Sequence, residues 1–194
     1  GRSKSKPKIS KSITGGLEWL RKHQDGDGRW DADEFMKHDS DGVPCDGAGN
    51  PAYDVGLTGL ALLAFFGDGA GMRPGEEDRS VVERGLAWLM AAQDPSTGIV
   101  GDQSASGLSA SGRSNHTFIY DHAIATIALC EGYGIFGGEE LRGAAQRALD
   151  CLESDYLKSQ RDPDMVLGYQ PRSGDNDTLG TAWYLQACAE GREG

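Results

Sequence analysis

Hydrophobic residues recur along this chain at helical spacing, in segments separated by polar stretches rich in glycine. In residues 12–24, Ile13, Leu17 and Leu20 fall on one face at i, i+4 and i+7, which predicts an amphipathic helix. Residues 51–66 are apolar on nearly every side, which is typical of a helix buried in the core. The same order then returns twice, so six helices are expected at about 12–24, 51–66, 78–92, 117 onward, 139–154 and 177 onward.

Equivalent residues mark this repeat. Trp88 in the second amphipathic helix takes the place of Trp19 in the first, and Asp121 lies 67 residues after Asp54 at the starts of two apolar helices. Internal repetition of a helical hairpin predicts stacked units that bury their apolar faces on one another. We therefore expect an all-α fold with outer and inner helix layers, an incomplete α/α toroid of about three hairpins.

Composition and charge indicate a globular domain and argue against a nucleic-acid-binding protein. The chain has 194 residues, of which 38% are hydrophobic, enough for one domain with a core. Residues 1–11 carry five of the 19 basic residues and none of the 30 acids, so residues 12–194 carry a net charge of −16. This argues against nucleic-acid binding through the folded domain. We expect a basic flexible tail or linker at 1–11, which allows peripheral contact with an anionic membrane, and a repeat domain at 12–194.

The four cysteines form no CxxC pair, and no run of 18 apolar residues is present. These features fit a reducing compartment and predict a location in the cytoplasm or peripheral to a membrane.

The first helix and the turn after it contain Gly16-x2-Trp19-Leu20-x3-Gln24-x3-Gly28-x-Trp30. This run resembles the QW motif of squalene and oxidosqualene cyclases, and the whole hairpin resembles the prenyltransferase and squalene oxidase repeat. A second copy has Val100 where the final tryptophan belongs. The motif is expected to lie in the outer layer, away from any cavity. Its structural residues are then Trp19, Gln24, Gly28, Trp30, Trp88 and Gln93.

The resemblance implies a terpenoid cyclase/prenyltransferase fold, and three functions are compatible with it. The first is a repeat domain without its own catalytic acid that binds an apolar, isoprenoid-like or protein ligand on its concave face. The second is a terpenoid-cyclase-type isomerase whose acid is unorthodox or lies outside this segment. The third is a polysaccharide-lyase-like enzyme with an acidic groove, to which the acids of residues 31–46 could contribute. We expect this segment alone not to be an enzyme.

The catalytic and metal motifs of the family are incomplete. Cyclases of this type use a DxDD acid, and the nearest run has Asn176 in place of the middle acid. Asp175 and Asp177 are the nearest catalytic candidates, although capping of the last helix explains them as well. Zinc in the prenyltransferases needs a cysteine two residues after Asp54, where Gly56 stands. No catalytic residue, metal or cofactor is therefore expected.

Polar residues gather at the N-terminal ends of the inner helices, which would surround the mouth of a central cavity in a toroid. Converging side chains there are the expected ligand contacts, although capping and compensation of the helix dipole also explain them. An arc of three hairpins would expose its inner apolar face, which predicts an apolar small molecule, a protein partner, an oligomer or a longer chain as its complement. The expected ligand-binding residues are Tyr53, Asp54, Tyr120, Asp121 and His122.

Overall fold

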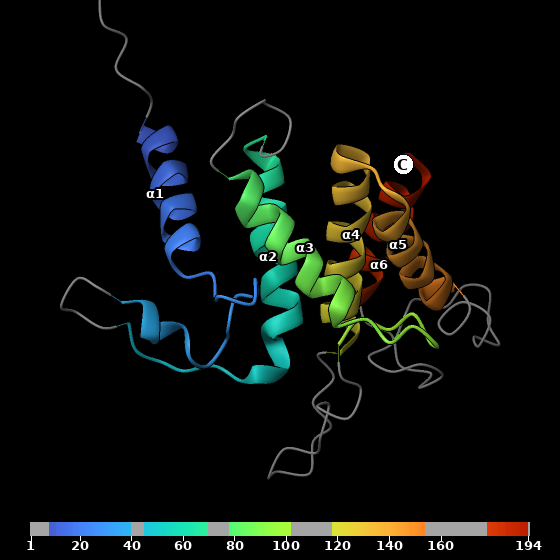
Figure 1. The fold of residues 1–194 in the computed structure, drawn as a ribbon, viewed down its shortest axis with the longest axis horizontal. Helices are drawn as coiled ribbons and strands as arrows, with labels where there is room; N and C mark the ends of the chain where they lie inside the picture. Colours follow the sequence, from blue (N-terminus) through green and yellow to red (C-terminus); the bar gives the residue numbers. More distant parts are fainter. Residues whose placement is uncertain (1–7, 40–44, 70–77, 102–117, 154–177, 194) are drawn as a thin grey trace, which may run out of the picture.

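The computed structural model describes residues 8–39, 45–69, 78–101, 118–153 and 178–193 (Figure 1). These residues form α-helices and two short 3-10 helices, with an isolated bridge between Gln93 and Val100, so the all-α prediction is confirmed. The helices are α1 Lys8–Lys22, η1 Phe35–His38, η2 Pro51–Tyr53, α2 Asp54–Gly67, α3 Arg79–Ala91, α4 Phe118–Phe136, α5 Glu139–Cys151 and α6 Thr178–Glu193.

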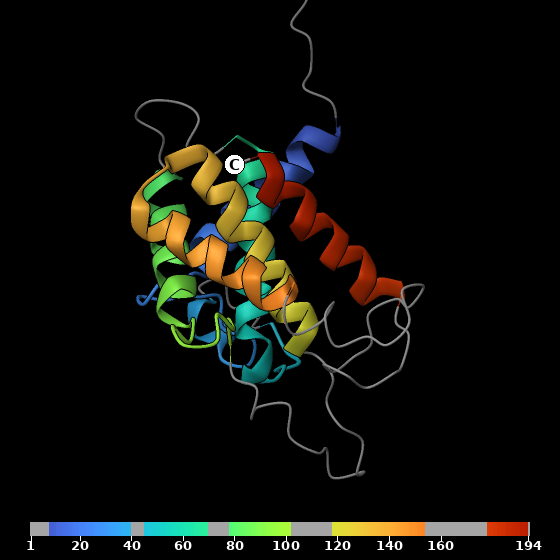
Figure 2. The same cartoon turned by 90° about the vertical axis from the view of Figure 1, so that its right-hand side faces the viewer.

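The apolar helices form a continuous row. α4 packs against α2 on one side and against α6 on the other. α3 packs on α2 and α4, and α5 packs on α4 and α6, so each of these two amphipathic helices covers the junction between two apolar ones. Figure 2 shows α3 and α5 together on one side of α4 and α6 on its other side. α1 packs on α2 alone among these contacts, and α1 and α6 lie at opposite ends of the row (Figure 1).

Glycines allow α2 and α4 to approach closely. A Cβ atom added at Gly56 would collide with the Asp121 carboxylate, and one at Gly59 would lie 2.9 Å from Ile124. Real Cβ atoms do not tolerate such contacts, so α2 and α4 can pack this tightly only with glycine on α2.

Asn50 caps η2 through a 2.9 Å bond from the Ala52 N–H to its side-chain oxygen, with Pro51 at the first helical position, as the sequence predicts. α1 begins at Lys8, inside the segment expected to be a tail. No glycine or proline interrupts residues 8–14, so nothing in the backbone prevents this extension.

Candidate binding groove and its carboxylate network

The glutamine of the motif joins the turn after α1 to α3. Gln24 lies just beyond α1, and its amide nitrogen donates to the carbonyl oxygens of Gly28 (2.9 Å) and Val81 (2.8 Å). The guanidinium of Arg84 on α3 donates to the Gln24 side-chain oxygen. We call this set the glutamine clasp. It gives hydrogen-bond partners to both the nitrogen and the oxygen of the buried Gln24 amide, and it fixes the turn after α1 to α3.

The clasp recurs between α3 and α5. Gln93 donates to the carbonyl oxygens of Gly98 and Ala144, each at 3.0 Å, and Arg147 donates to the Gln93 oxygen at 2.8 and 3.1 Å. Every role in the first clasp therefore has a counterpart in the second. The helical repeat inferred from the sequence is present in the contacts as well.

Both clasps require glycine in the turn. Gly28 has φ +105°, and a Cβ atom there would collide with the carbonyl oxygen of Arg84. We expect Gly28→Ala to lower the free energy of unfolding by about 1–3 kcal/mol, measured by urea denaturation followed by circular dichroism. Gly26→Ala is the matched control, because a Cβ atom there meets nothing within 4 Å, and it should change stability by less than about 0.5 kcal/mol. Equal losses in the two variants would contradict the role of the turn.

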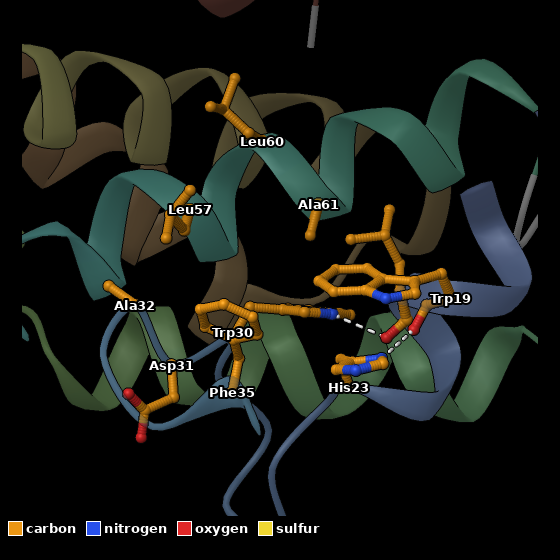
Figure 3. Close-up of a pocket in the computed structure, with 10 residues that line it drawn as sticks. Trp19, His23, Trp30, Asp31, Ala32, Phe35, Leu57, Leu60 and Ala61 are labelled. Atoms are coloured by element: carbon orange, nitrogen blue, oxygen red, sulfur yellow. Dashed lines mark hydrogen bonds between the residues drawn. The ribbon is translucent and has the colours of Figure 1, made fainter. Parts of the chain in front are cut away.

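An apolar groove lies between α1, the segment after it and α2 (Figure 3). Its volume is about 340 Å³. Trp19 and Trp30 line it, which corrects the expectation that the motif lies away from any cavity. Trp30 lies here because the segment after the clasp turns back across α1. The indole Nε1 of Trp30 donates to the Leu20 carbonyl oxygen at 2.8 Å. The lining residues are Trp19, Leu20, His23, Trp30, Asp31, Ala32, Phe35, Leu57, Leu60 and Ala61.

A network of charged residues holds the segment that forms one wall of the groove. Arg29 donates to Asp31 and Asp54, each at 3.2 Å, and Lys37 donates to Asp25 at 2.7 Å and to Asp31 at 3.0 Å. All three carboxylates are buried. Buried acids of this kind are stable when they are paired and hydrogen-bonded, and here each one is.

The partners of these acids set their pKa values. Burial opposes ionisation of Asp31, but hydrogen bonds from the Glu34 N–H and from Lys37 outweigh it and hold the pKa of Asp31 below its ordinary value. Hydrogen bonds with His38 and Lys37 likewise outweigh burial and lower the pKa of Asp25. Both acids therefore stay charged at neutral pH and act as anchors for the segment rather than as proton donors.

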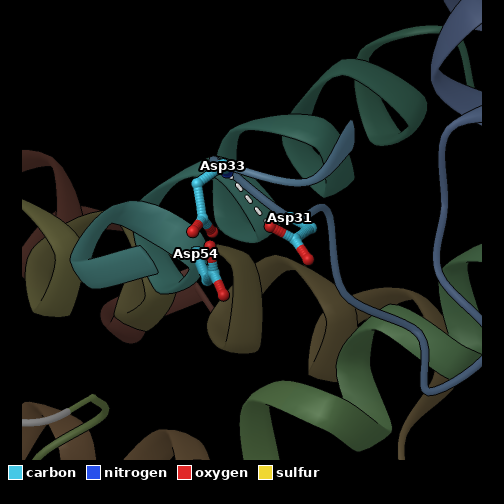
Figure 4. Close-up of side chains that lie close together, drawn as sticks. All are labelled: Asp31, Asp33 and Asp54. Carbon is cyan, nitrogen blue, oxygen red and sulfur yellow. Dashed lines mark hydrogen bonds between the residues drawn. The ribbon is translucent and has the colours of Figure 1, made fainter. Parts of the chain in front are cut away.

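Asp31, Asp33 and Asp54 each place a carboxylate oxygen within 4.8 Å of the others (Figure 4). Oxygen ligands at this spacing suit a hard cation such as Ca²⁺. Arg29 and Lys37 already neutralise Asp31, however, and Arg29 also pairs with Asp54. A metal would have to compete with these cations, and the geometry assigns none.

The predicted ligand-binding residues include a pair of acids, Asp54 and Asp121, in the first turns of α2 and α4. Asp54 accepts from the Ala32 N–H at 2.9 Å, and the carboxylate of Asp121 accepts from the Gly56 N–H. Burial and then the charge of Asp54 raise the pKa of Asp121 to about 7. Burial also raises the pKa of Asp54, against the effects of Ala32 and Arg29. A carboxyl that keeps its proton near neutral pH can donate it, but this one is buried between α2 and α4.

The remaining predicted positions differ in their surroundings. His122 is fully buried, its Nδ1 accepts from the Val100 N–H at 3.1 Å, and burial lowers its pKa to about 4, so it is neutral at pH 7. Tyr53 and Tyr120 are half-buried. Trp88 packs at the edge of the main core. Ligand contact by Tyr53, Asp54, Tyr120, Asp121 and His122 stays a prediction, and Asp175 and Asp177 lie outside the described residues.

The groove was not predicted from the sequence, and neither were Arg29 and Lys37, the cations that pair with the buried acids. Arg29 lies inside the motif, at its one unspecified position between Gly28 and Trp30, so the motif itself gave no reason to single it out. Lys37 and His38 lie in η1, between the first two predicted helices, where no element was expected. The available signal was the mixture of acids and bases in residues 25–39, which predicts pairing once the segment is known to fold back on itself.

No family model, curated protein or solved structure matches this chain. None of the helices in the described part of the chain has the length and apolar character needed to cross a membrane.

Proposed function

We propose that this chain is a squalene cyclase/prenyltransferase-like repeat domain, forming an arc of an α/α toroid, and that it binds an apolar partner in the groove between α1 and α2. The toroid is supported by the glutamine clasp, which recurs from α1 to α3 and from α3 to α5. It is supported also by the row of α2, α4 and α6, each junction of which is covered by an outer helix.

The observation that carries the binding role is the apolar groove itself. Leu57 and Leu60 on α2 are 40% and 42% exposed, and Trp19 opposite them is 42% exposed. Large apolar side chains gathered in a concavity gain free energy when a partner removes them from water, at about 25 cal/mol per Å². Binding is favoured over catalysis because the acid that lines the groove, Asp31, is held charged by Arg29 and Lys37.

The experiment uses Nile red, an uncharged apolar dye, titrated into the chain at submicromolar concentration and followed by its fluorescence. We expect saturable binding at one site, and displacement by farnesol if an isoprenoid fits the groove. Leu57→Asp should weaken dye binding by about tenfold, because it places a charge in the apolar wall.

Ile13→Asp is the matched control, since Ile13 is 50% exposed on α1 and does not line the groove. This variant should bind the dye like the wild type. Equal loss in both variants, or no loss in Leu57→Asp, would contradict the assignment of the groove.

A further inference from the structure

The repeat relates the exposed face of α2 to a face of α4 that is already covered. With Asp54 equivalent to Asp121, Leu57 corresponds to Ile124. Ile124 is 6% exposed because α4 meets Gly59 of α2 there, whereas Leu57 is 40% exposed. In the row of helices, the face of α2 that carries Leu57 is therefore the position where a preceding inner helix would pack.

At the other end of the row, α6 exposes the face that a following apolar helix would cover. Gly132 of α4 meets Leu86 and Gly191 of α6 meets Leu149, so positions on α4 and α6 correspond at a separation of 59 residues. By this relation the buried face of α4 made by Ala123, Thr126 and Cys130 corresponds to Ala182, Leu185 and Ala189 on α6. These three residues are exposed, and Leu185 is 60% exposed.

The two end faces are complementary. The α6 face presents one large apolar side chain, Leu185, between two alanines, and the α2 face presents the 340 Å³ groove beside Leu57 and Ala61. We call the face of an apolar helix that points to the next apolar helix in chain order its leading face, and the opposite one its trailing face. Inside the row, the leading face of each apolar helix covers the trailing face of the next. In the described part of the chain, the leading face of α6 is exposed at Ala182, Leu185 and Ala189, and the trailing face of α2 is exposed at Leu57 beside the groove.

We propose that α6 of a second copy of this chain packs head to tail on the α2 face and covers the groove. This rests on the proposed function, since it names the apolar partner that the groove binds. The interface joins two different surfaces, so a dimer that is not closed still carries one free α2 face and one free α6 face and can add further copies unless a ring forms. The net charge of −11 on each copy opposes association, so added salt should strengthen it.

Sedimentation velocity of the chain from 1 to 200 µM in 0.5 M NaCl tests the proposal. We expect the mean mass to rise with concentration and to rise less at low salt. Leu57→Asp and Leu185→Asp should each be monomeric at all these concentrations, while Ile13→Asp should associate like the wild type. A monomeric wild type, or association unchanged by Leu185→Asp, would overturn the proposal.

Mixing the two monomeric variants gives the sharper result. Leu57→Asp keeps its α6 face and Leu185→Asp keeps its α2 face, so the mixture should form a one-to-one dimer that grows no further. A symmetric interface would place one altered face in every mixed pair, and a mixture that stays monomeric would overturn the head-to-tail geometry. Binding of Nile red or farnesol without any self-association would reject the second copy as the partner but leave the proposed binding groove standing. If the chain neither bound these ligands nor associated, both proposals would be rejected.

Discussion

Replacing Trp30 with alanine is expected to lower the free energy of unfolding by about 3–5 kcal/mol. The side chain is 4% exposed and packs on Phe65 of α2 with ring centroids 6.0 Å apart. Its indole donates to Leu20 of α1, and its backbone N–H donates to Thr58 of α2 at 3.0 Å. The loss should be large because one residue fills the space between α1, α2 and α3, and small neighbours such as Gly85 cannot fill the cavity left behind.

The measurement is urea denaturation followed by circular dichroism, with Trp19→Ala as the matched control. Trp19 belongs to the same motif, but it is 42% exposed and stacks on His23 at the rim of the groove. Its removal should cost about 1 kcal/mol. Trp30→Phe keeps most of the ring and loses the bond to Leu20, so its cost should lie between the two. A cost for Trp30→Ala no greater than that for Trp19→Ala would reject the central packing role of Trp30.

The helices could be predicted from the sequence because their apolar periodicity is local information. α2 and α4 are apolar on most sides and are the buried helices of the row, and the Tyr-Asp pairs at 53–54 and 120–121 give their correct alignment. The motif also singled out Gln24, at a helix end, as a structural residue. Its partners could not be predicted: the amide meets the carbonyl of Val81 and the side chain of Arg84, more than 50 residues away along the chain.

The groove could not be predicted because it depends on how a polar segment folds back. Residues 25–39 contain acids and bases without helical or strand periodicity, so their structure is decided by long-range pairing. The bond from Arg29 to Asp54 fixes this segment to the start of α2, and Phe35 then reaches the groove beside Trp19. The motif predicted that Trp19 and Trp30 lie in the outer helix layer, and it gave no reason to expect a cavity between them.

Asp121 is expected to make the chain less stable as the pH rises from about 4 to 7. In the folded chain its pKa is about 7, against an ordinary value of 3.8, because of burial and then the nearby charge of Asp54. Between these two values the folded state binds more protons at this position than the unfolded state does. The free energy of unfolding must therefore fall with rising pH across this interval, and the contribution of the proton is lost above pH 7.

Asp121→Asn should remove this dependence, because the amide keeps the shape and can still accept from the Gly56 N–H but does not ionise. A difference of about 3 pH units corresponds to about 4 kcal/mol, so the variant should exceed the wild type by up to about that amount at pH 8 and by little at pH 4. Asp31 and Asp25, with lowered pKa values, favour the folded state in the opposite direction, but they are common to both chains and cancel in the difference. Asp150→Asn, at an exposed site on α5, should follow the wild-type profile to within about 0.5 kcal/mol. Parallel profiles for Asp121→Asn and the wild type would mean that Asp121 is already ionised in the folded chain, and that the close contact between α2 and α4 tolerates its charge beside that of Asp54.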